Sequence, residues 1–339
     1  MKEILIFCQA PADIQYALTI YDENKKSMDI SIYCINVEGM FNFLESLKLN
    51  LKQLVFIPYD IYLSYKNPIK IFRARRKLIS LYKRYFESNS DNDIYFFSHF
   101  FDFITFFMVA KLSKKNKVIF VNHYDDAICK NYKRPKLSIR YLKSYSLYKL
   151  NTGIDFKFYQ FNKRFIPEFN LEKYKIEELK ENILDKKVFK LFSYKIKNNN
   201  KKSILYLEMD YKKSNFIDNY EKVTIDVMKI IKSKGYYIYL KAHPRLGYSN
   251  FLNEYVDDFI NQDIPAEFID VQKFDYILGI SSSAIAFFSK ISNVKVFSLL
   301  ELYQYNSEDV KKRAIQYLCD LSDNLEYFDS LNDLDNKIK

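Results

Sequence analysis

The chain has 339 residues, of which 48% are hydrophobic and 28% are charged, a balance typical of folded proteins that excludes general disorder. This length exceeds what one hydrophobic core usually organises, so two domains are expected. The net charge is +11, from 53 basic and 42 acidic residues. Because the basic residues are spread along the chain and form no recognisable binding module, we expect no nucleic-acid partner.

The first half alternates short apolar runs with amphipathic stretches. Runs rich in β-branched and aromatic residues predict buried strands, and a period of 3.6 residues predicts helices between them. The expected strands are Glu3–Cys8, Asp29–Ile35, Gln53–Ile57, Asp93–Phe97, Lys117–Val121 and Ile154–Phe161. The expected helices are Ala12–Asn24, Met40–Leu49, Pro68–Phe86, Phe100–Leu112 and Leu137–Leu150. Strand–helix alternation of this kind builds a parallel sheet with helices on both faces.

A second α/β series follows a polar boundary segment at residues 171–200. Its expected strands are Ser203–Glu208, Tyr236–Lys241, Glu267–Val271, Tyr276–Ile280 and Val294–Leu299. Its expected helices are Asn215–Ser233, Asn250–Ile260, Ala284–Lys290 and Ser307–Cys319. We therefore predict one α/β domain over residues 1–190, a second over residues 201–320, and a C-terminal tail at 321–339 that packs back on the first domain. Two such domains joined by a hinge favour a cleft for a ligand.

Cysteine spacing and hydropathy limit the class of protein further. Cys8, Cys34, Cys129 and Cys319 lie far apart without a CxxC pair, which argues against a disulfide framework or a zinc site. No apolar run reaches the length of about 20 residues that spans a bilayer. The opening residues carry no small-residue cleavage site, so we expect no signal peptide and a cytoplasmic location.

Two adjacent carboxylates follow the strand that ends at Val121. Asp125 and Asp126 cannot both be cheaply buried and ionised, so one of them should have a raised pKa, as a general base requires. The alternative is that one of the two caps the next helix.

A histidine–proline turn follows the strand that ends near Leu240. Pro244 fixes the turn and pushes His243 toward an extended conformation. Lys241 and Arg245 flank the pair and would make a cationic pocket suited to phosphate. The alternative is an ordinary strand-end turn with a solvated basic rim.

Three consecutive serines occupy a strand–turn–helix junction. Ser281, Ser282 and Ser283 would place hydroxyl groups beside the free backbone N–H groups of a helix N-terminus, which favours an anion. The alternative is a serine N-cap without a ligand. No glycine-rich dinucleotide or P-loop fingerprint occurs in the chain, so NAD and ATP enzymes lose their main support.

In this order, the three loops resemble motifs of the bacterial sialyltransferases, which include capsular polysialyltransferases and lipooligosaccharide sialyltransferases. That family shares an acidic-acidic-Gly motif, a His-Pro motif and a late serine motif. Their counterparts here are Asp125-Asp126-Ala127, His243-Pro244 and Ser281-Ser282-Ser283. Residues 7–16 are similar to the family's opening strand and loop, and residues 264–267 to a short motif before the serines. Ala127 departs from the family's usual glycine, which would permit a positive φ.

The resemblance implies a GT-B fold, in which two Rossmann-like α/β domains face a central cleft. It also implies an inverting, metal-independent transfer of sialic acid, or a related nonulosonic acid, from a CMP-activated donor. The acceptor would be a cell-surface glycan such as capsule or lipooligosaccharide. No separate cofactor is implied. A lipid-linked acceptor and the basic balance of the chain imply peripheral contact with the inner face of the cytoplasmic membrane.

The resemblance also implies roles for single residues. Asp126 would take the proton of the acceptor hydroxyl, with Asp125 as the second choice. His243 would bind or protonate the departing phosphate, and Glu267 would accept hydrogen bonds from the ribose hydroxyls. The remaining donor-binding residues would be Lys241, Pro244, Arg245, Ser281, Ser282 and Ser283.

Three other functions stay open on the sequence. A CDP-glycerol-type glycerophosphotransferase also combines a two-domain fold with a His-Pro turn and late serines, but it typically places an aspartate shortly before and after the serines. Residues 279–288 contain no acid. UDP-sugar transferases share the fold. A non-catalytic glycan- or nucleotide-binding module is favoured only by Ala127 and by the low count of five glycines.

Overall fold

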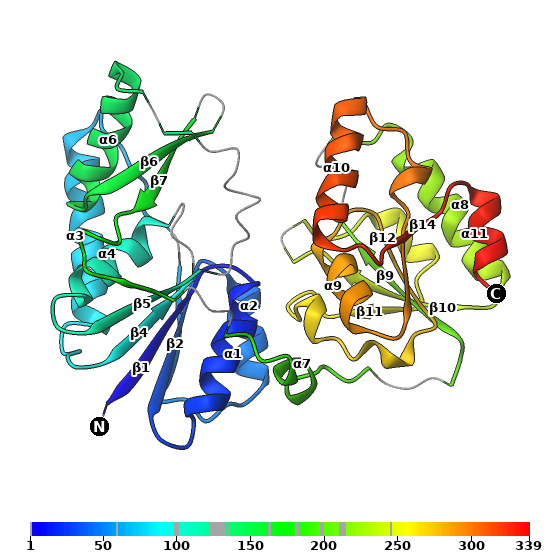
Figure 1. Ribbon diagram of the computed structural model, residues 1–339, viewed down its shortest axis with the longest axis horizontal. Helices are drawn as coiled ribbons and strands as arrows, with labels where there is room; N and C mark the ends of the chain where they lie inside the picture. Colours follow the sequence, from blue (N-terminus) through cyan, green and yellow to red (C-terminus); the bar gives the residue numbers. More distant parts are fainter. Residues whose placement is uncertain are drawn as a thin grey trace. The chain divides into compact units, whose positions relative to one another are not determined.

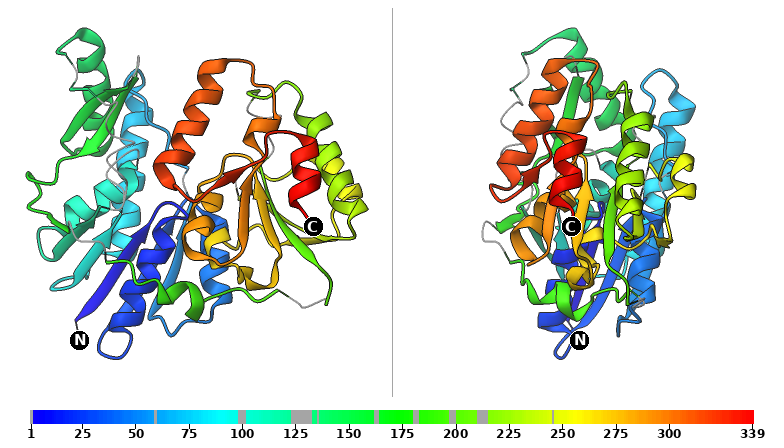
Figure 2. Two further views of the ribbon diagram at one scale, coloured as in Figure 1. Left: turned by 45° about the vertical axis from the view of Figure 1, so that its right-hand side comes forward. Right: turned by 90° about the vertical axis from the view of Figure 1, so that its right-hand side faces the viewer.

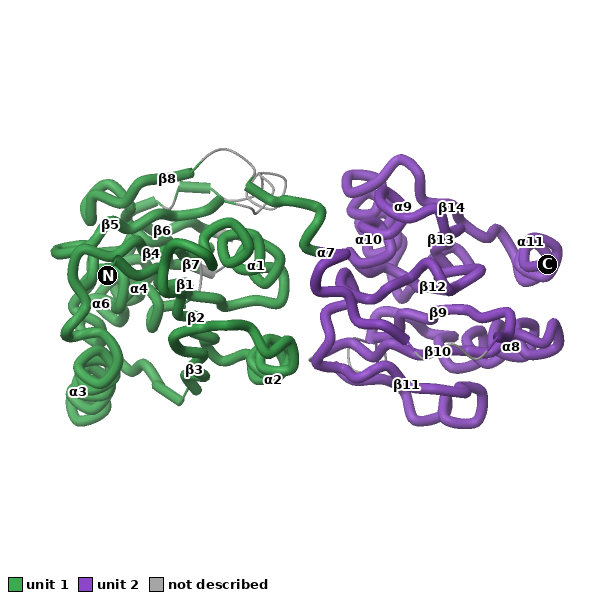
Figure 3. Tube along the Cα trace, turned by 90° about the horizontal axis from the view of Figure 1, so that it is seen from below, with its two compact units in different colours: residues 1–188 green, residues 189–339 purple. Residues whose placement is uncertain are grey.

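A computed structural model describes residues 2–58, 60–97, 102–122, 133–134, 136–161, 164–179, 183–196, 200–209, 215–244 and 246–339. The chain divides into two units, residues 1–188 and 189–339 (Figure 3). Each unit is built on its own six-stranded sheet in which every pair of neighbouring strands is parallel.

The sheet of the first unit has the strand order β3-β2-β1-β4-β5-β8 (Figure 3). Its strands are β1 Glu3–Cys8, β2 Asp29–Ile35, β3 Gln53–Ile57, β4 Asp93–Phe96, β5 Lys117–Val121 and β8 Glu177–Leu179. Every residue of β1 is buried, because helices cover both faces of the sheet. These helices are α1 Asp13–Asn24 and α2 Glu38–Ser46 on one face, and α3 Pro68–Tyr85 and α4 Phe103–Leu112 on the other.

A further helix and a hairpin complete the α3–α4 side of the first unit. They are α6 Ile139–Thr152, β6 Phe156–Phe161 and β7 Arg164–Phe169. Aromatic packing joins them to the core, since Phe169 stacks on Phe106 with ring centroids 5.0 Å apart. The sequence predicted β6 but not β7, because Pro167 argues against a strand. In this two-stranded sheet Pro167 pairs with Phe158 at an edge, where proline is tolerated.

The sheet of the second unit has the strand order β11-β10-β9-β12-β13-β14. Its strands are β9 Ser203–Glu208, β10 Tyr237–Ala242, β11 Asp258–Ile260, β12 Tyr276–Gly279, β13 Lys295–Ser298 and β14 Glu326–Tyr327. Its helices are α8 Tyr220–Ser233, α9 Ser283–Ile291, α10 Glu308–Leu321 and α11 Leu331–Lys337, and α7 Lys187–Leu191 lies at the division between the units. Short 3₁₀ turns complete it: η2 Asn250–Glu254, η3 Ala266–Phe268, η4 Val271–Lys273 and η5 Leu300–Leu302.

The two sheets share one topology. Numbered in chain order, the strands of each sheet run 3-2-1-4-5-6, which is the Rossmann order. The predicted fold class, two Rossmann-like α/β domains of the GT-B kind, is confirmed at this level.

The last residues of the chain form part of the second unit. Residues 321–339, predicted as a tail against the first domain, supply β14 to the second sheet and α11 beside α8 (Figures 1 and 2). Phe328 stacks on Phe297 of β13 at 4.4 Å between centroids, and Leu334 is buried. These apolar side chains hold the segment on the second unit.

Two predicted elements before β12 are wrong. The expected helix at 250–260 is instead η2 followed by the strand β11, and the expected strand at 267–271 is two 3₁₀ turns, η3 and η4. Asp270 starts η4 by accepting a hydrogen bond from Gln272 N. β11 is a three-residue edge strand with Phe259 exposed, so its sequence lacks the alternation that marks a half-buried strand.

Candidate functional site

Most of the residues selected from the sequence lie at or near the carboxyl ends of the second unit's strands. β10 and β12 flank β9, and the register pairs Ala242 with Glu208 and Gly279 with Leu207. The turns after β10 and β12 therefore leave the same edge of the sheet, two strand spacings or about 10 Å apart. At this point the order of the strands reverses, which is where open α/β sheets bind ligands.

The turn after β10 begins at His243, and backbone hydrogen bonds close it in both directions. His243 N donates to Gly247 O at 3.1 Å, and Gly247 N donates to His243 O at 2.8 Å. Gly247 has a φ of 71°, in the left-handed region that favours glycine. Pro244 is exposed in this turn, and Arg245 lies outside the described residues.

The imidazole of His243 is half-buried and held in one tautomer. Leu246 N donates to its Nδ1 at 3.2 Å. A ring nitrogen that accepts a hydrogen bond carries no proton, so the N–H of the neutral ring lies on Nε2. His243 is therefore set to donate from Nε2 to an anion. The sequence predicted the residue but could not predict the tautomer.

Lys241 lies inside the second unit. It is 4% exposed, and its Nζ donates to the carbonyl oxygens of Ala242 at 2.6 Å and Gln262 at 3.2 Å. Burial lowers the pKa of Lys241 to about 8, and attraction to Glu267 and Asp263 opposes this fall. Its positive charge therefore acts from the buried side of the edge.

Glu267 lies on η3, which packs against α9, and its side chain is half-buried. Burial raises the pKa of its carboxyl group, while the backbone and the charge of Lys241 oppose the rise. The attraction between this carboxylate and the buried ammonium of Lys241 could not be predicted from the sequence, because the sequence predicts a helix over β11 and a strand over η3.

The serine turn connects β12 to α9. Ser282 is the N-cap of α9, since its hydroxyl accepts a hydrogen bond from Ala284 N at 3.2 Å. The cap uses the hydroxyl oxygen as an acceptor, and the hydroxyl hydrogen can still be donated to an anion. Ser281 is half-buried and Ser283 is exposed. Burial raises the pKa of Tyr317, and a hydrogen bond with Ser283 opposes that rise.

Gly279 sets the direction in which α9 leaves the sheet. A Cβ built on Gly279 would lie 2.8 Å from Ile285 Cγ2 and 3.3 Å from Leu207 O. No side chain fits there unless α9 moves away from β12, so glycine brings the helix N-terminus close to the end of β9.

A carboxylate that the sequence analysis did not select lies between the two turns. Glu208 is the last residue of β9, is 3% exposed, and accepts hydrogen bonds from Tyr220 Oη and from Ser249 N, the latter at 3.3 Å. It ties the start of α8 and the segment before η2 to the edge. Glu208 could have been selected from the sequence because it is the final residue of a predicted strand.

The proposed catalytic carboxylates belong to the first unit. β5 ends at Val121 as predicted and leads directly toward Asp125 and Asp126. Both aspartates, with His123 and Ala127, lie outside the described residues.

Two other carboxyl groups, one buried and one half-buried, lie at the carboxyl edge of the first sheet, where β1 and β4 are neighbours. Asp13 is fully buried and accepts hydrogen bonds from Gln9 N at 2.6 Å and Ala10 N at 2.9 Å. Asp102 caps α4 by accepting from Ile104 N at 2.9 Å. Burial raises the pKa of Asp102, its hydrogen bonds oppose the rise, and Asp13 adds to it.

The side chain of Gln9 stands out at this edge. Its Nε2 and Oε1 atoms are both buried, and neither has a hydrogen-bond partner within the described ranges of the chain. An unpaired buried amide costs about 1–3 kcal/mol of stability, so a native protein that keeps one needs a reason. A polar ligand at the end of β1 would provide that reason.

Fold and site together define a protein of two Rossmann-like α/β units whose second unit gathers hydrogen-bond donors at the carboxyl edge of its sheet. The model of the alpha-2,8-polysialyltransferase family (POLYST) matches residues 2–301. The chain belongs to this family and is a glycosyltransferase. No curated protein sequence matches the chain.

Similar solved structures cover nearly the whole chain at low identity. The UDP-GlcNAc 2-epimerase from Methanocaldococcus jannaschii is 15% identical, with a TM-score of 0.49, over 99% of this chain and 92% of that chain. The glycotransferase of kitacinnamycin is 10% identical, with a TM-score of 0.49, over 98% and 89%. The E. coli ADP-heptose LPS heptosyltransferase II is 11% identical, with a TM-score of 0.42, over 96% and 90%. These likenesses do not bear on the activity of this chain.

Proposed function

We propose that the chain transfers sialic acid, or a related nonulosonic acid, from a CMP-activated donor to a cell-surface glycan such as capsule or lipooligosaccharide. Membership of the polysialyltransferase family supports the reaction class. The observation that carries the assignment of the donor site is the Nε2–H of His243 on the same sheet edge as the N-terminus of α9.

The donor phosphate would lie between the turns after β10 and β12. His243 donates from Nε2, and the positive, N-terminal end of the α9 helix dipole favours the same anion. Ser281, Ser282 and Ser283 add hydroxyl donors, and Arg245 adds a cation. Negative charge develops on the phosphate as CMP leaves. The hydrogen bonds from these donors are therefore stronger in the transition state than in the ground state.

Lys241 and Glu267 would serve the nucleoside part of the donor. The carboxylate of Glu267 accepts hydrogen bonds from the ribose hydroxyls, and its ionised form is favoured by the nearby buried ammonium of Lys241. Lys241 also adds positive charge beneath the phosphate site, and Pro244 holds the shape of the turn.

The transfer step would be a single inverting displacement. Asp126, with Asp125 as the second choice, accepts the proton of the acceptor hydroxyl as its oxygen attacks the anomeric carbon. The bond from that carbon to the phosphate oxygen breaks, and its electron pair leaves with CMP. The sugar passes through an oxocarbenium-like state. No metal ion takes part in this proposal.

Gln9 would bind the acceptor. Its buried amide offers one acceptor and two donor positions, the pattern that a sugar hydroxyl or acetamido group can satisfy. Its place at the end of β1 puts it on the same sheet edge as the end of β5, which lies four residues before Asp125 in the sequence.

A donor screen tests the proposal. Purified protein is incubated with CMP-sialic acid, other CMP-nonulosonic acids, CDP-glycerol and UDP-sugars, and the released nucleotide is measured with and without a sialylated acceptor and with EDTA. We expect CMP release from a CMP-nonulosonic acid, faster with acceptor and unchanged by EDTA. Slow release without acceptor separates an enzyme from a binding module. Release of UDP, or of CMP only from CDP-glycerol, would overturn the proposal.

A further inference from the structure

Helix α3 exposes an unusual face to solvent. It carries seven basic residues and no acidic ones. Ile69, Phe72, Arg76, Ile79 and Lys83 recur at intervals of three or four residues, so they share one face of the helix. Ile69 is 62% exposed and Phe72 is 66% exposed. Large apolar side chains thus alternate with cations on the solvent side, while Ala74 and Leu78 on the opposite side pack into the core.

Helix α6 has a similar exposed face. Ile139, Leu142, Lys143 and Leu150 lie at helical spacing on its solvent side, and Leu137 precedes the helix with 81% of its surface exposed. The helix has three basic residues and no acidic ones. It packs against α3 in the first unit (Figure 1).

These residues form a concentrated patch, which we call the α3–α6 surface. Within the described ranges, fifteen large apolar side chains are exposed, and seven of them belong to this surface. They are Ile69, Phe72, Ile79, Leu137, Ile139, Leu142 and Leu150. Scattered exposed apolar residues are normal, but a cluster of this kind marks a binding surface.

Most of the positive charge of the surface is not paired with carboxylates of the described residues. Among the described residues, only Lys77 of α3, paired with Asp60, and Lys149 of α6, paired with Asp155, form ion pairs. The other eight cations of the two helices form no ion pair with a described residue.

A cationic pocket opens beside this surface. It has a volume of about 190 Å³, and Arg75, Lys111, Lys114, Ile79 and Gly153 are among its lining residues. The Arg75 guanidinium lies so close to Gly153 that a Cβ there would be 2.9 Å from Nη2. None of its described lining residues is a carboxylate, so its charge suits a phosphate group.

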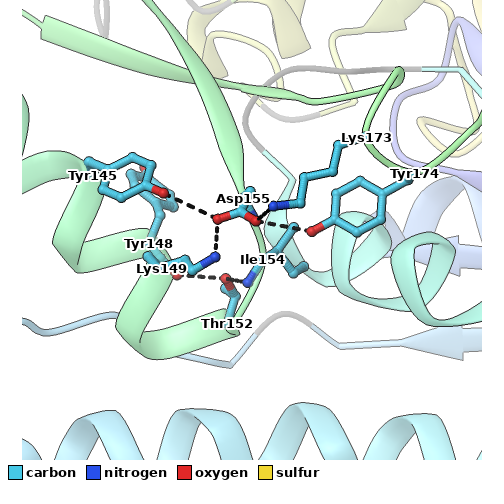
Figure 4. A network of polar contacts seen from close by, with 8 residues as sticks. All are labelled: Tyr145, Tyr148, Lys149, Thr152, Ile154, Asp155, Lys173 and Tyr174. Carbon is cyan, nitrogen blue, oxygen red and sulfur yellow. Dashed lines mark hydrogen bonds and ion pairs between the residues drawn. The ribbon is translucent and has the colours of Figure 1, made fainter.

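The polar network around Asp155 fixes α6 in place (Figure 4). Its carboxylate accepts hydrogen bonds from Tyr145 Oη at 3.1 Å and from Lys149 and Lys173, and its N–H donates to Tyr174 Oη at 3.0 Å. These contacts tie the last turns of α6 to the start of β6 and to the turn at residues 171–175. The surface is therefore presented by anchored helices.

We propose that the α3–α6 surface docks on an anionic lipid bilayer. Its aliphatic and aromatic side chains enter the headgroup region, its cations contact lipid phosphates, and the pocket at Arg75 takes one phosphate. Exposed Ile and Leu favour lipid over nucleic acid, which is bound through Arg, Lys and stacking aromatic rings. Within the described residues, no helix is long and apolar enough to cross a bilayer. The proposed contact involves no donor-site residue, so it stands independently of the proposed function.

Flotation of the full-length protein with lipid vesicles tests this docking. The vesicles are phosphatidylcholine alone, or phosphatidylcholine with about one third phosphatidylglycerol. Two double variants alter the surface. Arg76→Glu with Lys83→Glu reverses two of its charges, and Phe72→Ser with Ile79→Ser replaces two of its apolar side chains. The matched control is Lys222→Glu with Lys229→Glu on α8, two exposed lysines whose replacement changes the net charge equally. Thermal melts check that all variants fold.

The wild type should bind the anionic vesicles and not the neutral ones. Both α3 variants should lose about tenfold or more in affinity, and the α8 control should lose less than about twofold. An equal loss in the α8 control would overturn the proposal, because net charge alone would then explain binding. Full binding by the Phe72/Ile79 variant, or equally tight binding to a single-stranded RNA, would overturn it as well.

Discussion

The two sheets of this chain have the same strand order, yet their carboxyl edges carry opposite chemistry. The second sheet presents hydrogen-bond donors, namely the Nε2–H of His243 and the N-terminus of α9, above the buried charge of Lys241. The first sheet presents carboxylate acceptors and a buried amide, namely Asp13, Asp102 and Gln9.

This difference indicates a division of work between the units. Donors and positive charge suit a departing nucleotide phosphate. Carboxylates and an amide suit a sugar hydroxyl that must be positioned and deprotonated. One topology can support both tasks because the loops at the strand ends, and not the strands, decide which ligand is bound.

The largest expected effect comes from removing the proposed base of the first unit. Asp126→Asn should lower kcat for transfer by roughly 10²- to 10⁴-fold, because the acceptor hydroxyl then keeps its proton. CMP affinity, measured by calorimetry, should stay nearly unchanged. Asp125→Asn should do less damage. A variant that keeps more than about a tenth of wild-type activity would refute the role of Asp126.

The next effect concerns the donor edge of the second unit. His243→Ala should cost roughly 10²-fold in transfer, because one hydrogen bond to the departing phosphate is lost. His243→Gln should recover part of this loss, since the amide nitrogen of glutamine can take the place of Nε2. The free energy of unfolding should fall by only about 1 kcal/mol.

His123→Ala is the matched control for His243, because His123 follows a strand of the other unit and matches no family motif. We expect it to retain most activity in the same kinetic assay. Equal losses in the two histidine variants would remove the phosphate role of His243.

A smaller effect is expected from Gln9, at the carboxyl edge of the first sheet. Gln9→Met should raise the KM for acceptor by roughly 3- to 10-fold, the value of one lost hydrogen bond. It should also stabilise the free protein by about 1 kcal/mol, because it removes a buried amide that has no hydrogen-bond partner among the described residues. Kinetics with varied acceptor and denaturant unfolding measure the two quantities. A destabilised variant with unchanged KM would show that Gln9 is only a packing residue.

The smallest effect on transfer at neutral pH is expected from Lys241→Met, and the informative measurement is stability against pH. Burial lowers the folded pKa of Lys241 from 10.5 to about 8. Between these two values the unfolded chain binds more protons than the folded chain. Lys241 therefore destabilises the folded state most below pH 8, and this destabilisation decreases as the pH rises from 8 to 10.5.

The free energy of unfolding of the wild type should therefore rise relative to Lys241→Met by at most about 1.4 kcal/mol per pH unit above pH 8. Parallel curves for the two proteins between about pH 7 and 10 would contradict a lowered pKa for Lys241.

The sequence predicted most of the fold because buried parallel strands carry a strong local pattern. β1, β2, β3, β5 and β9 begin and end at the predicted residues. The prediction over β11 was wrong because its position at the edge of the sheet, and not the pattern of its three residues, makes it a strand. The predicted packing of residues 321–339 was wrong because the elements that they contact, α8 and β13, are distant in sequence.

The candidate site was predicted in part. The His-Pro and serine turns could be found because proline, glycine and serine have fixed effects at strand ends. The tautomer of His243 depends on Leu246 N, and the unpaired amide of Gln9 depends on everything packed around it. Such properties arise from three-dimensional contacts and leave no local pattern in the sequence.

Binding of CMP by calorimetry to four proteins tests the division of work most directly. The wild type is compared with His243→Ala on the second sheet edge, and with Gln9→Met and Asp126→Asn in the first unit. The account predicts that His243→Ala weakens CMP binding by about tenfold or more, while the other two variants bind CMP within about twofold of the wild type. Weakening of CMP binding by the first-unit variants, with His243→Ala unchanged, would contradict the account.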